Sequence, residues 1–311
     1  MAESKESSRK REKTVVDQDP SCSNLISLFD DFFIDDSKKV GEKRGRVKAD
    51  ANVDKLPKEI RPPSQWFSVF NARKPMKQRF HSNVSDGRLS HHIEKGFSDK
   101  LRISCVSCCS NLWVLIMDAG TDYTDQVYNL SPSFLPKKWI YEQWAKKFYI
   151  TSLAGSKKGS SIVVMSKGTP YTTQRYKVSR SFPKEWINKK REQGFHVTSM
   201  GTAGIRWCIV MSCNAGFSDQ LVELDFLYPS EGIQKRLDNG CRITATAATL
   251  NQSALILSIP SNKPGDETQE TLHTLKFPSA NVREKWSKNL YLAQLCYGRI
   301  LSRSPLPSEF S

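Results

Sequence analysis

The alternation of apolar and polar positions is clearest between Phe182 and Leu227, where one short helix and three short strands are predicted. Pro183 opens a charged amphipathic run that ends before Gly194, and this placement of proline and glycine is typical of a helix. Three runs rich in β-branched, aromatic and aliphatic residues follow, separated by glycine, asparagine or serine, which favour turns. These runs are Phe195–Met200, Arg206–Ser212 and Gln220–Phe226. The predicted unit is a helix followed by three strands.

Equivalent residues recur before and after this stretch at intervals of 46–49 residues. One period shared by independent columns indicates a structural repeat, so five copies of each element are predicted. The helix column is Ile93, Ile140, Ile187, Ile233 and Val282. The first-strand column is Ile103, Ile150, Val197, Ile243 and Leu292. The second-strand column is Phe70, Met117, Met165, Met211 and Leu257, and the third is Gln78, Gln126, Gln174, Gln220 and Gln269.

The two ends of the repeat region hold complementary halves of a unit. The chain enters at a second and a third strand, Trp66–Phe70 and Gln78–Phe80, and leaves after a helix and a first strand, Val282–Trp286 and Leu290–Leu295. Joining these ends would complete a fifth unit and leave no strand edge unpaired. We therefore predict a mainly β fold, a five-unit β-propeller-like ring that is closed by pairing of N-terminal and C-terminal pieces. An open solenoid, which needs polar terminal caps, is the alternative.

Composition separates a tail from the folded part. Residues 1–61 are dense in Ser, Asp, Lys and Glu and hold little that can be buried, so a disordered tail is predicted there. The repeat domain is predicted over residues 62–303, and a short C-terminal tail over residues 304–311. The apolar island Leu25–Phe33 within the first tail is a stray apolar patch, a segment docked on its own domain, or a partner motif.

Positive charge is concentrated in the folded part. The formal net charge is +15, and residues 1–61 carry 14 Lys and Arg against 13 Asp and Glu, whereas residues 62–311 carry 33 against 19. Such a domain favours acidic partners, either proteins or nucleic acid. The candidate basic binding patch consists of Arg73, Lys74, Lys77, Arg79, Lys157 and Lys158. A solvated basic surface is the alternative.

A second basic cluster lies in the tail and is of the kind that nuclear import receptors bind. Its residues are Lys38, Lys39, Lys43, Arg44, Arg46 and Lys48. They predict a location in the nucleus, or in nucleus and cytoplasm, with a solvated charge run as the alternative. No apolar run approaches the roughly 18 residues of a membrane span, and the chain start lacks a signal-peptide core, so no membrane partner is expected.

Motifs for catalysis or metal binding are weak. Cys105, Cys108 and Cys109 follow His91 and His92, but a structural zinc site usually needs a second matched pair, so reduced thiols packed in strands are favoured. The sequence contains no G-x-S-x-G of a serine hydrolase, and none of the G-x-G, H-R-D or D-F-G motifs of a protein kinase. No catalytic residue, cofactor or metal is therefore predicted.

The glutamine column and the helix tryptophans are the most regular polar and aromatic features. Five equivalent amides could line a ring, but amides at matched repeat positions more often pair with backbone groups of neighbouring units. Inter-unit packing is predicted for the tryptophans Trp139, Trp144, Trp186 and Trp286. Arg191 and Leu237 stand at the helix positions that other units give to Trp144 and Trp286. Exceptions of this kind are the better places to look for function.

Long strings in the repeat region resemble a known family. They include KPMKQRFHSNVSDGRLSHHIEKG, NLWVLIMDAGT, IVVMSKGTPY, FPKEWINKK and VELDFLYPSEGI. From about Gln65 to Ser302 the chain is similar to the C-terminal, non-catalytic region of plant casein kinase I-like (Mut-nine-like) serine/threonine kinases. The resemblance implies a non-catalytic protein-interaction module in light, flowering or chromatin signalling, with a kinase or a nuclear signalling protein as partner. A basic nucleic-acid-binding or chromatin-binding protein, and a fragment of a longer kinase, are the alternatives.

Overall fold

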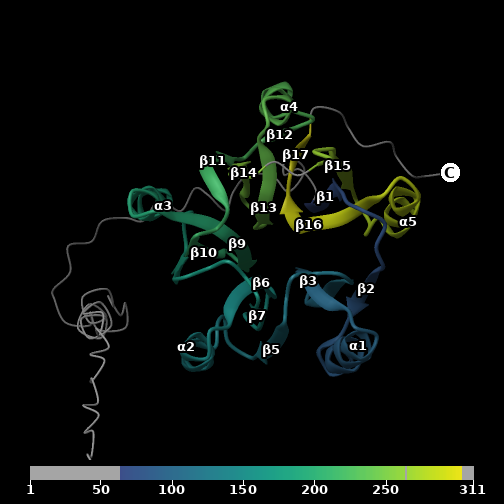
Figure 1. Ribbon diagram of the computed structural model, residues 1–311, viewed down its shortest axis with the longest axis vertical. Coiled ribbons are helices and arrows are strands. Elements are labelled where there is room, and N and C mark those ends of the chain that lie inside the picture. The colour runs from purple at the N-terminus through teal and green to yellow at the C-terminus, as the bar shows by residue number, and fades with distance from the viewer. Residues whose placement is uncertain (1–63, 263–264, 303–311) are drawn as a thin grey trace, which may run out of the picture. The chain divides into compact units, whose positions relative to one another are not determined.

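The computed structural model of the protein describes residues 64–262 and 265–302. The basic cluster Lys38–Lys48, the apolar island Leu25–Phe33 and residues 304–311 lie outside the described residues. Within them the fold is mainly β, as predicted, with five three-stranded antiparallel sheets, one two-stranded pair and five helices (Figure 1). No helix of the described residues is both long and apolar enough to cross a membrane.

Each three-stranded sheet has an inner, a central and an outer strand, and the helices lie at the periphery (Figure 1). The inner strands are β3 (Arg102–Cys109), β6 (Tyr149–Gly155), β9 (Phe195–Ala203), β13 (Arg242–Ala248) and β16 (Leu290–Arg299). The central strands are β1 (Ser64–Ala72), β4 (Leu112–Asp118), β7 (Ser161–Lys167), β10 (Arg206–Cys213) and β14 (Ser253–Pro260). The outer strands are β2 (Gln78–Val84), β5 (Asp125–Ser131), β8 (Gln174–Ser179), β11 (Phe217–Leu224) and β15 (Gln269–Thr274). The helices are α1 (Asp86–Ser98), α2 (Lys137–Ala145), α3 (Lys184–Arg191), α4 (Glu231–Asp238) and α5 (Ser279–Ser287).

The sheets differ from the predicted unit in the origin of the outer strand. The predicted unit placed all three strands after the helix, whereas in the structure the strand before each of the helices α1 to α4 pairs with the central strand that follows that helix. The resulting orders are β2-β4-β3, β5-β7-β6, β8-β10-β9 and β11-β14-β13. The third strand of the stretch Phe182–Leu227 therefore belongs to the next sheet. Spacing alone does not reveal where a unit begins, because every starting point gives the same period.

This strand order explains the helices. The outer strand β2 and the inner strand β3 both pair antiparallel with β4, so they run parallel to each other. Parallel strands of one sheet need a crossover connection, and α1 supplies it. Proline precedes three of the helices as the N-cap residue, at Pro136, Pro183 and Pro278. Because proline fixes its φ angle and lacks an amide donor, it suits the start of a helix.

The fifth sheet combines both ends of the described chain. Its central strand β1 pairs antiparallel with β15 on one side and with β16 on the other, so that Trp66 lies opposite Thr274 and Tyr297. The predicted pairing of N-terminal with C-terminal pieces is therefore present for β1. The predicted contribution of Gln78–Phe80 to the same sheet is wrong, because β2 pairs with β4.

A short parallel pair lies beside this sheet. It joins β12 (Leu227–Tyr228) to β17 (Leu301–Ser302), near the end of the described residues. The preceding side chain, Phe226, is buried and packs edge-on against Phe67 of β1, with 5.1 Å between ring centroids. The connection between β11 and α4 thus adds apolar contacts between the fourth and fifth sheets.

The core lies between neighbouring sheets, and central strands are buried on both faces. The central strands therefore read as continuous apolar runs such as WVLIM in β4 and IVVM in β7. One apolar cluster packs Ile103 and Met117 of the first sheet against Ile162 of the second. Another packs Leu292 of the fifth sheet against Ile116 of the first.

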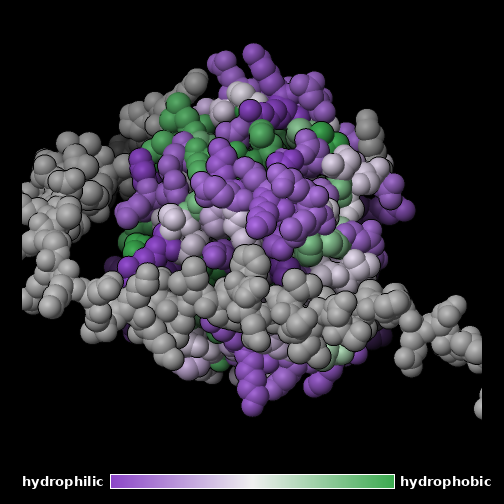
Figure 2. Space-filling view, turned by 90° about the vertical axis from the view of Figure 1, so that its left-hand side faces the viewer, coloured by the Kyte–Doolittle hydropathy of each residue, from purple (hydrophilic) through white to green (hydrophobic). Residues whose placement is uncertain are grey.

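The inner strands contact one another in cyclic order: β3 with β6, β6 with β9, β9 with β13, β13 with β16, and β16 with β3. A five-unit ring requires this order, although the closed propeller-like ring itself stays a prediction. The described part of the outer side seen in Figure 2 is predominantly hydrophilic, with smaller hydrophobic areas between the charged side chains.

Candidate functional site

The five glutamines of the repeat lie at one end of the sheets, which we name the glutamine end, and each joins two neighbouring sheets. Gln126 accepts a hydrogen bond of 2.7 Å from the Ile103 amide in the preceding sheet and donates one of 2.9 Å to the carbonyl of the same residue. The same pair of bonds links Gln174 to Ile150, Gln220 to Val197 and Gln269 to Ile243. Gln78 makes the pair with Leu292, across the first and fifth sheets. We refer to each set of bonds as a glutamine clamp.

Each clamp has a further acceptor at the end of a central strand. Hydroxyls serve for three glutamines: Ser166 for Gln126, Ser212 for Gln174 and Ser258 for Gln220. The amide oxygen of Asn71 serves for Gln269, and the carboxylate of Asp118 serves for Gln78 at 2.7 Å. These acceptors escaped the sequence analysis, although they follow the second-strand column by one residue.

The Asp118 carboxylate is the charged exception among these acceptors. It is buried, and this burial raises the pKa of Asp118, while the hydrogen bond from Gln78 and the charge of Arg73 act in the opposite direction. A buried carboxylate that has lost its water relies on such donors. Gln78 therefore both links the first and fifth sheets across their boundary, or seam, and stabilises a buried charge.

Two of the four predicted packing tryptophans take part in clamps. Trp144 and Trp286 donate their Nε1–H groups to the side-chain oxygens of Gln174 and Gln78, at 3.0 and 2.9 Å. The other two, Trp139 and Trp186, pack against apolar clusters of the second and third sheets.

Arg191 and Leu237, which stand where other units have a helix tryptophan, make contacts with side chains near them. Arg191 pairs with the carboxylate of Asp219, which also accepts a hydrogen bond of 2.7 Å from the Gln220 amide. Leu237 packs against the apolar cluster between the fourth and fifth sheets. Both positions therefore contribute to contacts between neighbouring sheets.

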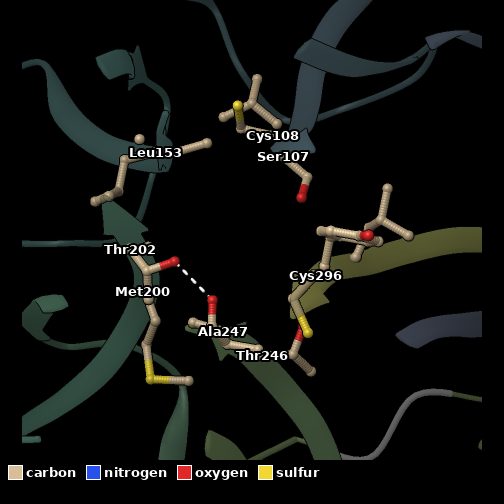
Figure 3. A pocket seen from close by; sticks show the side chains of 15 residues that line it. Ser107, Cys108, Leu153, Met200, Thr202, Thr246, Ala247 and Cys296 are labelled. Carbon is tan, nitrogen blue, oxygen red and sulfur yellow. Dashed lines mark hydrogen bonds between the residues drawn. The ribbon is translucent and has the colours of Figure 1, made fainter. Parts of the chain in front are cut away.

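A small cavity lies between the five inner strands (Figure 3). Its volume is about 30 Å³, which suits a water molecule and is far below that of a typical ligand pocket. The hydroxyl of Ser107 points into it, and the Thr202 hydroxyl donates a 2.7 Å hydrogen bond to the carbonyl of Ala248 (Figure 3). The strands approach closely, because a Cβ on Gly201 would lie 2.3 Å from a Leu153 methyl carbon. The inner strands are therefore closely packed around this cavity.

The end opposite the glutamines is formed by the turns that join inner to central strands, and we name it the turn face. It consists of residues 110–112, 156–160, 204–206 and 249–252, together with Arg299. Neighbouring turns touch, since the Lys158 amide donates a 3.0 Å hydrogen bond to the side chain of Asn111, and Arg299 donates to the carbonyl of Asn251. The turns thus form one surface.

Exposed apolar side chains gather on the turn face. Eight large apolar side chains are exposed in the part of the chain that the structure describes, and three of them belong to these turns. They are Ile205 at 55%, Leu250 at 48% and Leu112 at 36% exposure. The first two stand in adjacent turns of the third and fourth sheets. Clustered exposed apolar groups mark interaction surfaces more often than isolated ones do.

Unpaired cations accompany these apolar groups. Lys157 and Lys158 are exposed in the turn of the second sheet, and the guanidinium of Arg206 lies 5.0 Å from the centre of the Phe134 ring. No carboxylate among residues 64–262 and 265–302 forms an ion pair with any of these three cations. The two lysines were predicted from the sequence, whereas Ile205 and Leu250 were not, although a single apolar residue inside a predicted turn is a signal of exposure.

The candidate basic patch is divided between the two ends of the sheets. Arg73, Lys74 and Lys77 lie in the connection that leaves the end of β1, at the glutamine end. Arg79 pairs with Asp99 near the same end. Lys157 and Lys158 are on the turn face, so the structure does not bring the six residues together.

The histidines and cysteines of the first sheet are close but form no metal centre. The His81 and His92 rings lie 4.1 Å apart, and His91 follows at 5.7 Å from His92. Burial, and then the charges of His92 and nearby cations, lowers the pKa of His81 to about 4. Burial raises the pKa of the Cys105 and Cys108 thiols to about 12. No group of three or more His, Cys, Asp or Glu side chains is arranged to hold a metal ion in the described ranges.

A family model and a plant protein both match the region that contains the five sheets. The family described as Domain of unknown function (DUF7477) matches residues 38–302. The chain is 61% identical over 296 residues to Casein kinase 1-like protein HD16 of Oryza sativa subsp. japonica, and the match covers 91% of this chain and 42% of that protein. The chain thus spans less than half of this relative, in a part outside the kinase region, and the resemblance noted from the sequence is confirmed. No solved structure matches the chain.

Proposed function

This chain belongs to the family described as Domain of unknown function (DUF7477), and from this premise we propose that it is a non-catalytic protein-interaction module that docks its partner on the turn face. The observation that carries the proposal is the placement of Ile205 and Leu250 beside the unpaired cations of neighbouring turns. Apolar groups flanked by charge are the usual ingredients of a protein interface.

The architecture that we propose is a closed five-unit, β-propeller-like ring. It is supported by the cyclic order of the inner strands and by a glutamine clamp at each seam, including the seam of Gln78 and Leu292. A rigid ring of this kind holds its turns in fixed positions, because every sheet is packed on both faces. A preformed surface loses less conformational entropy when it binds.

The docking proposal is tested by capture from plant nuclear extract with the full chain as bait. The double variant Ile205→Asp/Leu250→Asp puts charge on the turn face, and we expect it to lose the partners that the parent protein captures. The matched control is Leu221→Asp/Ile259→Asp, which alters two comparably exposed apolar side chains on strands of the fourth sheet. Thermal melting verifies that both variants are folded.

The result that contradicts docking on the turn face is equal capture by the parent and the Ile205→Asp/Leu250→Asp protein. Loss of the same partners in the Leu221→Asp/Ile259→Asp control would also contradict it, because the effect would then follow the number of altered side chains and not their place. Partners that depend only on the turn-face pair support the proposal.

The proposed setting is nuclear signalling beside a kinase, in keeping with the name of the rice relative. The residues proposed to direct nuclear import are the tail cluster that begins with Lys38 and Lys39. A fluorescent fusion of the full chain is expected in the nucleus. Replacing the six cluster cations by alanine is expected to leave it in the cytoplasm, and unchanged nuclear signal would contradict the assignment.

Nucleic-acid binding is the second candidate function, favoured by the net charge of +14 that residues 62–311 carry. Binding of this type has an affinity that falls steeply with salt, because bound cations of the nucleic acid are released. Titration of a labelled DNA duplex at several salt concentrations tests it. Weak binding with no salt dependence would exclude this function.

A further inference from the structure

Resting on the proposed function, we infer that the turn face recognises an acidic segment of a partner protein in which bulky aliphatic side chains stand between carboxylates. The docking proposal concerns only the place of binding. The inference concerns the chemistry of the partner, and it follows from the groups that the turns present and from those that they lack.

The charge of the turn face is positive and uncompensated near its centre. Residues 156–160 contribute Lys157 and Lys158, and the turn of the third sheet contributes Arg206. The carboxylate nearest to the turns in the fourth sheet is Asp225, which is already engaged: it lies 3.8 Å from Arg299 and accepts hydrogen bonds from the Gln252 side chain and the Ser253 amide. No carboxylate of the described residues pairs with these three cations, so each can pair with a carboxylate of a partner.

Arg206 is the most ordered of these cations. Its guanidinium lies over the Phe134 ring, at 5.0 Å from the ring centre, so the side chain has lost part of its freedom before a partner arrives. A guanidinium presents parallel N–H groups that match both oxygens of a carboxylate. The two lysines in the neighbouring turn act as point charges that steer and orient an acidic chain.

The aliphatic groups distinguish a protein partner from nucleic acid. Ile205 and Leu250 stand in adjacent turns, and the turns are linked below them by the bond from Thr202 to Ala248. Nucleic-acid bases bind mainly by stacking on aromatic side chains, and no aromatic residue occurs in residues 110–112, 156–160, 204–206 or 249–252. The nearby Phe134 ring is covered by the Arg206 guanidinium. Leucine and isoleucine side chains of a peptide, in contrast, gain from burial against such groups.

Exposed ion pairs are weak individually, so the aliphatic contacts must supply much of the affinity and the charges much of the selectivity. A segment that has carboxylates without aliphatic side chains, or the reverse, should therefore bind poorly. This dependence on both features is the property that an experiment can isolate.

Fluorescence anisotropy of the full chain with short labelled peptides provides the test. The first peptide alternates pairs of leucines with pairs of aspartates, the second replaces aspartate by asparagine, and the third replaces leucine by serine. We expect the first peptide to bind, and each of the others to bind at least about tenfold more weakly, which corresponds to a difference of about 1.4 kcal/mol.

Matched variants locate the binding. Lys157→Glu/Lys158→Glu and, separately, Ile205→Ser are expected to weaken binding of the first peptide at least about tenfold. The control for charge is Lys146→Glu/Lys147→Glu, which makes the same change in an exposed lysine pair at the glutamine end. The control for apolar exposure is Leu221→Ser on an outer strand. Both controls are expected to bind like the parent.

Equal binding of the first and third peptides, with a steep salt dependence, would overturn the inference in favour of simple charge attraction. A DNA duplex that displaces the first peptide and depends on the same lysines would also overturn it. If no peptide binds while nuclear partners are still captured through Ile205 and Leu250, the partner chemistry is wrong and the docking proposal stands. If capture fails as well, the proposed function fails.

Discussion

The seam between the second and third sheets and the seam between the fifth and first sheets contain the same clamp in different surroundings. At the first, the side chain of Gln174 donates a hydrogen bond to the neutral hydroxyl of Ser212. At the second, Gln78 donates a hydrogen bond to the buried carboxylate of Asp118. The first clamp joins segments 24 residues apart, and the second joins Gln78 to a residue 214 positions away. The seam that joins the N-terminal and C-terminal parts of the described residues therefore also holds the buried charge.

The fifth sheet also contains buried polar side-chain atoms that lack a hydrogen bond, as the first and fourth sheets do. The Ser68 hydroxyl and the Gln65 side-chain oxygen of β1 are buried without a hydrogen-bond partner among the described residues. At the position of Ser68 the other central strands carry apolar residues, namely Leu115, Val163, Ile209 and Leu255. The same glutamine clamp therefore forms with either a neutral hydroxyl or a buried carboxylate as its further acceptor.

The largest expected effect comes from breaking a clamp at each seam. Gln78→Ala removes the hydrogen-bond partner of the half-buried Trp286 indole and of two buried groups, the Leu292 backbone and the Asp118 carboxylate. Each unpaired buried group costs about 1–3 kcal/mol. We expect the free energy of unfolding to fall by at least about 3 kcal/mol, measured by urea denaturation. Gln174→Ala should lower the free energy of unfolding by less, because the acceptor that it leaves without a donor is the neutral Ser212 hydroxyl.

The control for both variants is Gln193→Ala, since Gln193 is exposed and only receives a surface hydrogen bond from Lys190. It is expected to change stability by less than about 0.5 kcal/mol. If Gln174→Ala lowers the free energy of unfolding as much as Gln78→Ala, or more, the two seams do not differ as proposed. The buried Asp118 charge would then add nothing to the effect of losing Gln78.

A smaller effect is expected from neutralising the charge itself. Asp118→Asn keeps an oxygen that can accept the Gln78 hydrogen bond and removes a buried carboxylate, so we expect the free energy of unfolding at pH 7 to rise by about 1 kcal/mol. The pKa of Asp118 is raised above its ordinary value of 3.8, so the parent protein binds more protons when folded. Its stability should therefore fall as pH rises from that value through the raised pKa, and Asp118→Asn should lack this fall.

Unfolding curves over a pH series measure this difference directly. The exposed residue Asp238 supplies the control Asp238→Asn, for which we expect less than about 0.5 kcal/mol of change. If Asp118→Asn is destabilising at pH 7, the carboxylate is better solvated by Gln78 and Arg73 than its burial implies.

The smallest effect concerns the unsatisfied hydroxyl of the fifth sheet. Ser68→Ala removes a buried polar atom that has no described partner, so we expect stability to rise by about 0.5–1 kcal/mol. Ser212→Ala makes the same chemical change in a satisfied clamp and should lower stability by about 1 kcal/mol. Thermal melts of the two variants give opposite signs if the comparison holds, and equal signs if it does not.

The sequence predicted the elements of this fold better than their grouping. The strands expected at Phe195–Met200 and Arg206–Ser212 agree closely with β9 and β10, because apolar periodicity follows burial directly. The assignment of the outer strand failed, since the spacing of a repeat has no intrinsic starting point. Nothing local in the residues around Gln220 tells which central strand its own strand will join.

The candidate site was less accessible from the sequence. Lys157 and Lys158 stand out as an adjacent pair, but their separation from Arg73 depends on which end of a strand each connection leaves. Ile205 and Leu250 look like core residues until the turns that carry them are placed. Exposure is a property of the packed sheets, and its one signal in the sequence is the position of a single apolar residue inside a short turn.

Hydrogen exchange of the full chain, followed by mass spectrometry, tests most directly the claim that β1 closes the fold between β15 and β16. Since β1 pairs on both sides, we expect its amides to exchange as slowly as those of the central strand β7. Exchange of β1 and β15 that is faster by orders of magnitude, while β7 stays protected, would contradict closure by the two ends of the chain.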